Sequence, residues 1–117
     1  MPADLNPGHT RIFAAIAAIP YGRVASYGAI AIRAGLPGRA RLVGTLLGKV
    51  PEGMVLPWYR VVRASGHIAL VPGSAGFREQ CRRLRGEGVV VKNGRVALGS
   101  FGLDGDLDRE LWGGFGD

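Results

Sequence analysis

The sequence predicts an α+β fold of the winged helix-turn-helix type. Three observations favour this class: apolar residues recur at helical spacing through the first half of the chain, a glycine-bearing turn separates two short helices, and Asn93-Gly94 separates two β-branched runs. The chain has 117 residues, 47% of them hydrophobic. This length and composition suit one small domain with a modest core.

Three helices are expected before residue 50. Asn6-Pro7 is typical of a helix start, and Pro20 ends the apolar periodicity that follows it. Residues 23–25 then predict a short strand, and Ser26 an N-cap for a second helix that ends at Gly35. A third helix is predicted over residues 39–49, and its buried stripe comprises Leu42, Val43, Leu46 and Leu47.

The second and third helices match a helix-turn-helix, although any two packed amphipathic helices give a similar pattern. The solvent face of the third helix carries candidate DNA-binding residues: Arg39, Arg41, Gly44, Thr45 and Lys49. A glycine in a helix costs about 1 kcal/mol relative to alanine, so Gly44 needs an explanation. It either packs closely against another element or leaves a smooth face that DNA can approach.

Beyond residue 50 the pattern predicts β-ribbons and one more helix. Residues 58–62 and 68–70 are expected to pair as a hairpin, and residues 71–76 form a loop. A helix follows over residues 77–85, with Cys81 on its apolar side as a small core residue. A second hairpin is expected across Asn93-Gly94. We therefore expect one domain over residues 1–98 and a glycine-rich acidic extension over residues 99–117.

Charge is distributed unevenly along the chain. The formal net charge is +6, but residues 101–117 hold five acidic residues against Arg109 alone. The first 100 residues therefore carry 14 basic and 4 acidic residues, a net +10. A basic body of this size indicates a polyanionic partner, most often nucleic acid. A solvated cationic surface that serves only solubility is the alternative.

Several classes of protein are disfavoured. The single cysteine, Cys81, excludes an intrachain disulfide and a cysteine-based zinc site. His9 and His67 have no carboxylate near them in the sequence, so neither a metal nor a cofactor is expected. No secretory signal pattern and no membrane-spanning apolar run is present. We therefore expect a cytoplasmic monomer that does not bind membranes.

Five short segments occur in an order that is more specific than any one of them. They are Tyr21-Gly22-Arg23-Val24, Arg41-Leu42-Val43-Gly44, Pro57-Trp58-Tyr59-Arg60-Val61-Val62, Ser74-Ala75-Gly76 and Glu87-Gly88-Val89. Together they resemble the C-terminal DNA-binding domain of the O6-alkylguanine-DNA alkyltransferases over about residues 10–98. The likeness is greatest to the alkyltransferase-like branch, whose members lack the acceptor cysteine and bind alkylated DNA without repairing it.

The resemblance places Trp58 at the acceptor cysteine, Tyr59 at the histidine and Glu87 at the glutamate of those enzymes. An indole offers no nucleophile, and an unperturbed phenol titrates near pH 10, too high for a general base at neutral pH. We therefore expect no catalytic residues and no alkyl transfer. Two alternatives stay open: Trp58 simply fills the core, or the chain is an enzyme with an unexpected nucleophile.

The same resemblance assigns roles in binding. Arg41 would enter the duplex and fill the space of a rotated base, and Tyr27 would lie near the phosphate beside the lesion. The alkylguanine pocket would comprise Trp58, Tyr59, Arg60, Ser74 and Ala75. The alternatives are an ordinary surface arginine at position 41 and a merely exposed Tyr27.

The predicted function follows from these roles. We expect the protein to bind double-stranded DNA that carries O6-alkylguanine, by base flipping and without alkyl transfer. Such a complex would mark the lesion for DNA repair, with nucleotide excision repair proteins as partners. The alternative is a winged-helix regulator that reads DNA sequence and has no preference for lesions.

Overall fold

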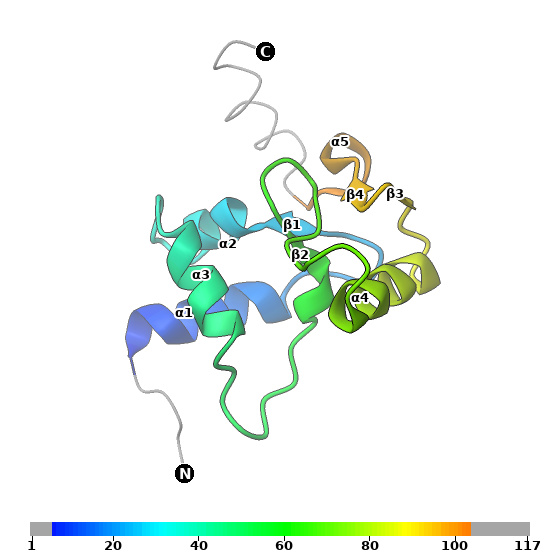
Figure 1. Cartoon of the computed structure of the whole chain (residues 1–117). Helices are drawn as coiled ribbons and strands as arrows, with labels where there is room; N and C mark the ends of the chain where they lie inside the picture. Colours follow the sequence, from blue (N-terminus) through cyan, green and yellow to red (C-terminus); the bar gives the residue numbers. More distant parts are fainter. Residues whose placement is uncertain (1–5, 104–117) are drawn as a thin grey trace.

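The computed structural model describes residues 6–103 as a mixed α+β domain (Figure 1), which confirms the expected fold class. Its helices are α1 (Pro7–Ala17), α2 (Tyr27–Arg33), α3 (Ala40–Leu47), α4 (Ala75–Gly86) and α5 (Leu98–Phe101), with one 3₁₀ turn, η1 (Trp58–Arg60). The strands are β1 (Ala25–Ser26), β2 (Val61–Val62), β3 (Val91–Lys92) and β4 (Arg95–Val96). β1 pairs with β2 in parallel, and β3 pairs with β4 antiparallel.

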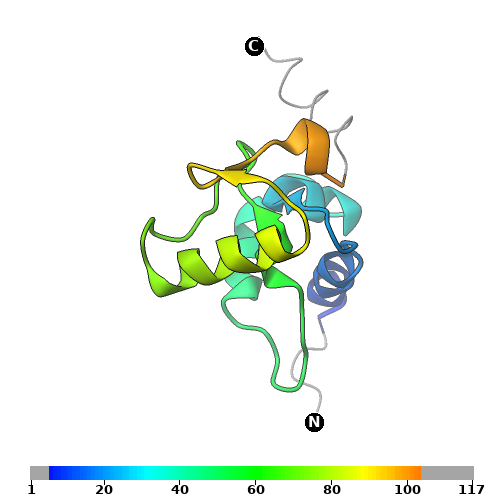
Figure 2. The same cartoon turned by 90° about the vertical axis from the view of Figure 1, so that its right-hand side faces the viewer.

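The short β1–β2 pair separates two apolar clusters. Successive side chains of a strand point to opposite sides. Val61 therefore packs with the cluster formed by α1, α2 and α3, whereas Val62 packs with the cluster formed by α4 and the β3–β4 hairpin. Figure 2 shows the molecule turned so that α4 and the β3–β4 hairpin lie nearest the viewer. Two adjacent residues thus belong to two different cores.

Side-chain caps begin the helices where the sequence predicts them. The Asn6 side chain accepts hydrogen bonds from the backbone N–H groups of Gly8 and His9, and Pro7 occupies the first helical position. Ser26 is fully buried, and its hydroxyl accepts from the Ala29 N–H at the start of α2. Both predicted N-caps are confirmed.

The predicted helix-turn-helix is present as α2 and α3. Gly35 ends α2 with a φ of +77°, a left-handed conformation that favours glycine. Val43 and Leu46 bury one side of α3, while Leu42 and Leu47 are partly buried against the same cluster. The opposite side of α3 is solvent-exposed and presents Arg41, Gly44 and Thr45.

The hairpin predicted over residues 58–62 and 68–70 is wrong. Residues 58–60 form η1, and β2 pairs instead with β1. The Gln80 side-chain amide donates to the carbonyls of Tyr59 and Val61, at 3.0 and 3.1 Å, so these acceptors are already satisfied. The chain turns tightly at Gly66, and residues 66–68 bond to Gly94 and Val96. A side chain from α4 therefore takes carbonyls that a hairpin partner would have used.

The second predicted hairpin is confirmed. Asn93 and Gly94 have φ values of +54° and +71°, as the tight two-residue turn requires. After β4, the Val24 N–H donates to the Phe101 carbonyl and the Leu103 N–H donates to the Val24 carbonyl. Residues 99–103, expected within the acidic extension, thus pack beside Val24. The remainder of that extension, residues 104–117, lies outside the described residues.

The described helices are short. α4 has 12 residues, and about 20 are needed to cross a bilayer. Across residues 6–103 no helix is long and apolar enough to do so. Cys81 is buried in the second cluster, as predicted for a core cysteine. That same part of the chain brings no three histidine, cysteine, aspartate or glutamate side chains together as metal ligands.

Gly66 provides a test of this packing. Its φ is +90°, and a Cβ atom there would lie 2.1 Å from the Val96 carbonyl oxygen. We expect Gly66→Ala to lower the free energy of unfolding by about 2–4 kcal/mol, through left-handed strain and a steric clash. Gly53→Ala is the control, because its φ is +85° but a Cβ would meet nothing within 4 Å. Equal losses in urea denaturation would contradict the proposed clash.

Candidate nucleic-acid interface

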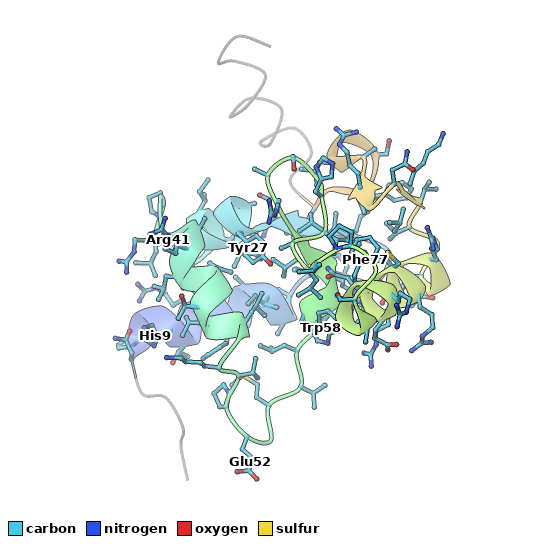
Figure 3. The ribbon with its side chains drawn as sticks, in the orientation of Figure 1. His9, Tyr27, Arg41, Glu52, Trp58 and Phe77 are labelled. Carbon is cyan, nitrogen blue, oxygen red and sulfur yellow. The ribbon has the colours of Figure 1, made fainter. Side chains whose placement is uncertain are left out.

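A groove of about 870 Å³ follows the exposed side of the helix-turn-helix. It is lined by Tyr27, Gly28, Ala40, Arg41, Gly44, Thr45, Arg63, Ala64 and Ala69. Most of these side chains are small, and the charged ones are both arginines. Figure 3 shows Arg41 on the outer side of α3, with Tyr27 between α3 and the centre of the molecule. Small residues with basic neighbours suit close contact with a sugar-phosphate backbone.

Packing within the chain does not require a glycine at position 44. A Cβ atom there would lie 3.7 Å from the Tyr27 ring, an ordinary van der Waals contact. At Gly28, on the same groove, a Cβ would meet nothing within 4 Å. The glycines therefore leave space on the outside of the groove, which favours close approach by a ligand.

The other predicted DNA-binding residues lie at the two ends of α3 and within the groove. Arg39 precedes α3 and Lys49 follows it, and both are exposed. The Thr45 hydroxyl donates to the Arg41 carbonyl at 3.1 Å. Burial raises the pKa of Tyr27, with Arg63 opposing the shift, so the phenol keeps its proton at neutral pH. Tyr27 can therefore donate a hydrogen bond to a phosphate.

η1 forms an aromatic corner against α4. The Trp58 and Tyr59 rings meet edge to face, with centroids 5.8 Å apart and planes at 87°. The Arg83 guanidinium of α4 lies 5.2 Å from the centre of the Tyr59 ring. Trp58 is partly exposed, so its indole is not a fully buried core side chain. It offers aromatic surface on which a planar ligand could stack.

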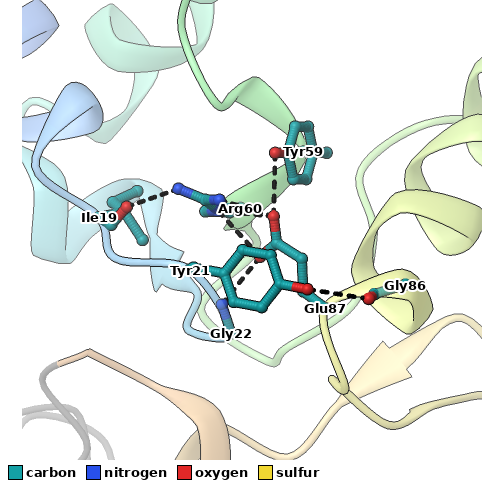
Figure 4. Close-up of polar contacts among 7 residues, drawn as sticks. All are labelled: Ile19, Tyr21, Gly22, Tyr59, Arg60, Gly86 and Glu87. Carbon is teal, nitrogen blue, oxygen red and sulfur yellow. Dashed lines mark hydrogen bonds and ion pairs between the residues drawn. The ribbon is translucent and has the colours of Figure 1, made fainter.

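Glu87 is the centre of the polar network beneath this corner (Figure 4). Its carboxylate accepts from the Gly22 N–H at 2.8 Å, from the Tyr59 hydroxyl at 3.0 Å and from the Arg60 guanidinium at 2.6–3.2 Å. Only 7% of the Glu87 side chain and 13% of the Arg60 side chain are exposed. The network joins the turn before β1, η1 and the C-terminal end of α4.

The network fixes the protonation states of its members. Burial raises the pKa of Glu87, but hydrogen bonds from Arg60, Gly22 and Tyr59 outweigh it and leave the pKa below its usual range. Burial and the hydrogen bond to Glu87 raise the pKa of Tyr59. At neutral pH Glu87 is ionised and Tyr59 is protonated. The phenol therefore acts as a donor toward Glu87 and cannot take a proton from a ligand.

Three of the predicted pocket residues have other partners in the fold. Arg60 directs its guanidinium at Glu87 and at the Ile19 carbonyl, 2.8 Å away. The Ser74 hydroxyl accepts from the Phe77 N–H at 3.2 Å and so caps α4. Ala75 is the exposed first residue of α4. Arg60 thus supports the aromatic corner from below, while Ser74 and Ala75 place the start of α4.

Sequence reasoning missed three contributors to the site. Arg63 and Gly28 line the groove, and Gln80 holds the backbone of η1 and β2. Gln80 did leave a signal, since it is a polar residue four positions before the apolar Leu84 and one before Cys81. Nothing local marks Arg63, because its position depends on the tight turn at Gly66.

A helix-turn-helix with a basic groove and a supporting hairpin defines the winged helix-turn-helix class of domain. A family model described as 6-O-methylguanine DNA methyltransferase, DNA binding domain, matches residues 7–89. The chain belongs to this family. The match spans the helix-turn-helix, the aromatic corner and Glu87, so all parts of the site described above fall within it.

Two relatives are similar to this chain over most of their own length. A DNA base-flipping protein of Vibrio parahaemolyticus is 45% identical over 92 residues, covering 78% of this chain and 90% of the relative. Alkyltransferase-like protein 1 of Schizosaccharomyces pombe is 36% identical over 104 residues, covering 89% and 93%. The resemblance to the alkyltransferase-like branch is therefore confirmed.

A solved structure shares the fold. The crystal structure of S. pombe Atl1 in complex with damaged DNA containing O6-carboxymethylguanine has a TM-score of 0.75 and 31% identity, covering 86% of this chain and 98% of that one. The Mycobacterium tuberculosis alkyltransferase OGT in complex with DNA has a TM-score of 0.61 and 34% identity, covering 72% and 51%. Both support the expected fold class.

Glu87→Gln tests the network. Removal of one partner of a nearly buried ion pair leaves the Arg60 charge uncompensated, so we expect a loss of about 3 kcal/mol in unfolding free energy at pH 7. Because folding lowers the pKa of Glu87, its stabilisation is present above the unfolded pKa. It is lost as the pH falls through the lower folded pKa. The difference in unfolding free energy between the wild type and Glu87→Gln should therefore disappear at acidic pH.

Glu79→Gln is the matched control on the same helix. Glu79 pairs with the exposed arginines Arg82 and Arg83, and such solvent-screened surface pairs contribute little to stability. Guanidinium denaturation of both variants between pH 3 and pH 8 makes the comparison. A loss at Glu87 no larger than that at Glu79 would contradict the central role of this carboxylate.

Proposed function

We propose that this protein binds double-stranded DNA containing O6-alkylguanine, rotates the modified base out of the duplex and holds it without removing the alkyl group. The observation that carries the proposal is the aromatic corner: Trp58 and Tyr59 stand beside Glu87 where the family resemblance places an acceptor cysteine and a histidine. The family membership and the similarity to a relative solved with O6-carboxymethylguanine DNA support it.

The groove of the helix-turn-helix would hold the duplex. Gly28 and Gly44 leave room for the DNA backbone, and Arg39, Lys49 and Arg63 would lie near phosphates. Tyr27 would donate its phenol proton to the phosphate beside the lesion. Arg41 would enter the stack, because extrusion of a base leaves a gap that a planar guanidinium can fill while it forms hydrogen bonds.

The extruded base would lie against Trp58. Stacking of a base on an aromatic side chain contributes about 1–3 kcal/mol, which offsets part of the cost of unpairing. Tyr59 would form the adjoining wall, and Ser74 and Ala75 at the start of α4 would border the alkyl group. Arg60 and Glu87 would act from beneath, by holding η1 in place.

Alkyl transfer would be absent because no group at the corner can complete it. Transfer requires a nucleophile that bonds to the alkyl carbon while the bond between that carbon and the guanine O6 atom breaks. The indole of Trp58 has no such lone pair, and Tyr59 keeps its proton. The chain's single thiol, Cys81, is only 6% exposed and lies in the apolar cluster behind α4.

Binding without turnover repairs nothing, so the complex would act by being recognised. We propose that it marks the lesion for nucleotide excision repair, as a monomer in the cytoplasm. The net charge of +10 over the first 100 residues would supply sequence-independent attraction to DNA, and the affinity would fall steeply with salt.

Lesion preference is the decisive measurement. At one fixed salt concentration, a duplex with a single O6-methylguanine should bind at least tenfold more tightly than the same duplex with guanine, by fluorescence anisotropy. Incubation with O6-benzylguanine should leave the intact mass unchanged. Equal affinities for the two duplexes would favour a sequence-reading regulator, and a benzyl adduct would identify an enzyme.

Two substitutions in the groove separate its roles. Arg41→Ala should weaken binding of the lesion duplex about tenfold or more, because one stacked and charged group is lost. Gly44→Ala should raise the free energy of unfolding by about 0.5–1 kcal/mol through helix propensity, yet weaken DNA binding. Arg82→Ala, at an arginine of α4 whose side chain is 70% exposed, is the control. If Gly44→Ala binds DNA normally, α3 does not approach the duplex closely.

A further inference from the structure

A second cleft lies on the side of the molecule formed by α4 and the β3–β4 hairpin. It has a volume of about 700 Å³. Its apolar lining includes Ile68, Phe77 and Cys81, and its basic lining comprises Arg78, Arg82 and Arg85 of α4. The cleft therefore combines an apolar floor with a cationic rim, which suits an anionic ligand that carries an aromatic group.

A smaller cleft of about 490 Å³ adjoins the first, since His67 and Asn93 line both. It adds Lys92 and Arg95 from the hairpin, and it ends at Ser100 and Phe101 of α5. We call the two clefts together the hairpin groove. This groove leads from the last described helix to the apolar floor beside α4.

The positive charge of the hairpin groove is poorly compensated. Arg78, Arg85 and Arg95 donate to the backbone carbonyls of Gly73, Val91 and Ser65. Within residues 6–103, only Arg82 of the groove's basic side chains forms an ion pair, with Glu79. Hydrogen bonds to carbonyls hold the guanidinium groups in place but leave their charge available to an anion.

The chain leaves the described part of the structure at one end of this groove. The hydrogen bonds between Val24, Phe101 and Leu103 fix that exit beside the smaller cleft. The sequence then continues Asp104-Gly105-Asp106-Leu107-Asp108-Arg109-Glu110-Leu111-Trp112, with Phe115 three residues later. Four acids thus follow the exit directly, and two aromatic residues follow the acids.

We propose that the hairpin groove binds the protein's own C-terminal segment, residues 104–117. The acids next to the exit would face Lys92 and Arg95, and Trp112 would fill the apolar floor beside Phe77. Trp112 lies nine positions after Leu103, and an extended chain of that length spans about 30 Å, enough to follow the groove. A short tether also gives an effective concentration in the millimolar range, so weak contacts suffice.

The hairpin groove shares no lining residue with the groove of the helix-turn-helix. In Figure 1, α3 lies on the left of the molecule, and α4 with β3 and β4 on the right. Docking of the segment would neutralise positive charge on the side away from α3. It would thereby confine the attraction for phosphates to the helix-turn-helix side.

The test is nuclear magnetic resonance on the full chain without DNA, so its outcome is independent of the proposed function. At about 50 mM salt, we expect nuclear Overhauser contacts from the Trp112 indole to Ile68 and Phe77. The order parameter of the indole N–H should exceed about 0.6. The Overhauser contacts and the high order parameter should both be lost when Asp104, Asp106 and Asp108 are changed to asparagine. They should also be lost in Arg85→Gln. Arg83→Gln, on the other side of α4, should retain them.

Three results would overturn the proposal. The first is an indole that has no contacts with the groove at low salt, or contacts that the charge changes leave intact. The second is loss of the contacts on tenfold dilution, which would place the segment on a second copy. The third is a groove whose resonances respond to added duplex DNA and not to the tail substitutions, which would make it a phosphate-binding surface.

Discussion

The carboxylate of Glu87 holds together segments that lie far apart in the sequence. It joins Gly22 before β1, the aromatic pair of η1 through Tyr59 and Arg60, and the end of α4. The strands themselves contribute only two residues each to the parallel pair. A nearly buried ion pair of this kind is stable only when its lone pairs are satisfied, and here three donor residues satisfy them. The position of the aromatic corner therefore depends on Glu87 together with Gln80, whose side-chain amide bonds to the backbone of η1 and β2.

The two apolar clusters support two different faces of this small domain. One cluster supports α3 and its groove, and the other supports α4 and the hairpin. Val61 and Val62 join them, because neighbouring side chains of one strand face opposite clusters. The aromatic corner lies next to this junction. A displacement of β2 would therefore change the spacing between the groove beside α3 and the aromatic corner, the two places at which we propose that one duplex is held.

Local signals in the sequence predicted much of this fold. Asn6, Ser26 and Gly35 mark helix boundaries, and Asn93-Gly94 marks a hairpin, through interactions within a few residues of each other. The error over residues 58–70 has the opposite origin. The parallel pairing of β1 with β2 joins residues 36 positions apart, and Gln80 reaches the same backbone from α4. The ion pair of Arg60 with Glu87, which lies 27 positions away in the sequence, is a long-range contact of the same kind.

The bond from Tyr59 to Glu87 also limits what this scaffold could become. A cysteine introduced at position 58 would adjoin Tyr59, whose phenol keeps its proton. The carboxylate of Glu87 already accepts hydrogen bonds from Tyr59 and Arg60. Neither Tyr59 nor Glu87 could take the proton from the thiol, so the cysteine would lack a general base. Efficient alkyl transfer from position 58 would thus need a second change at position 59 and a rearranged ion pair beneath it. Without them, a cysteine there would be mostly a neutral thiol at neutral pH, because an unperturbed thiol has a pKa of about 8.5.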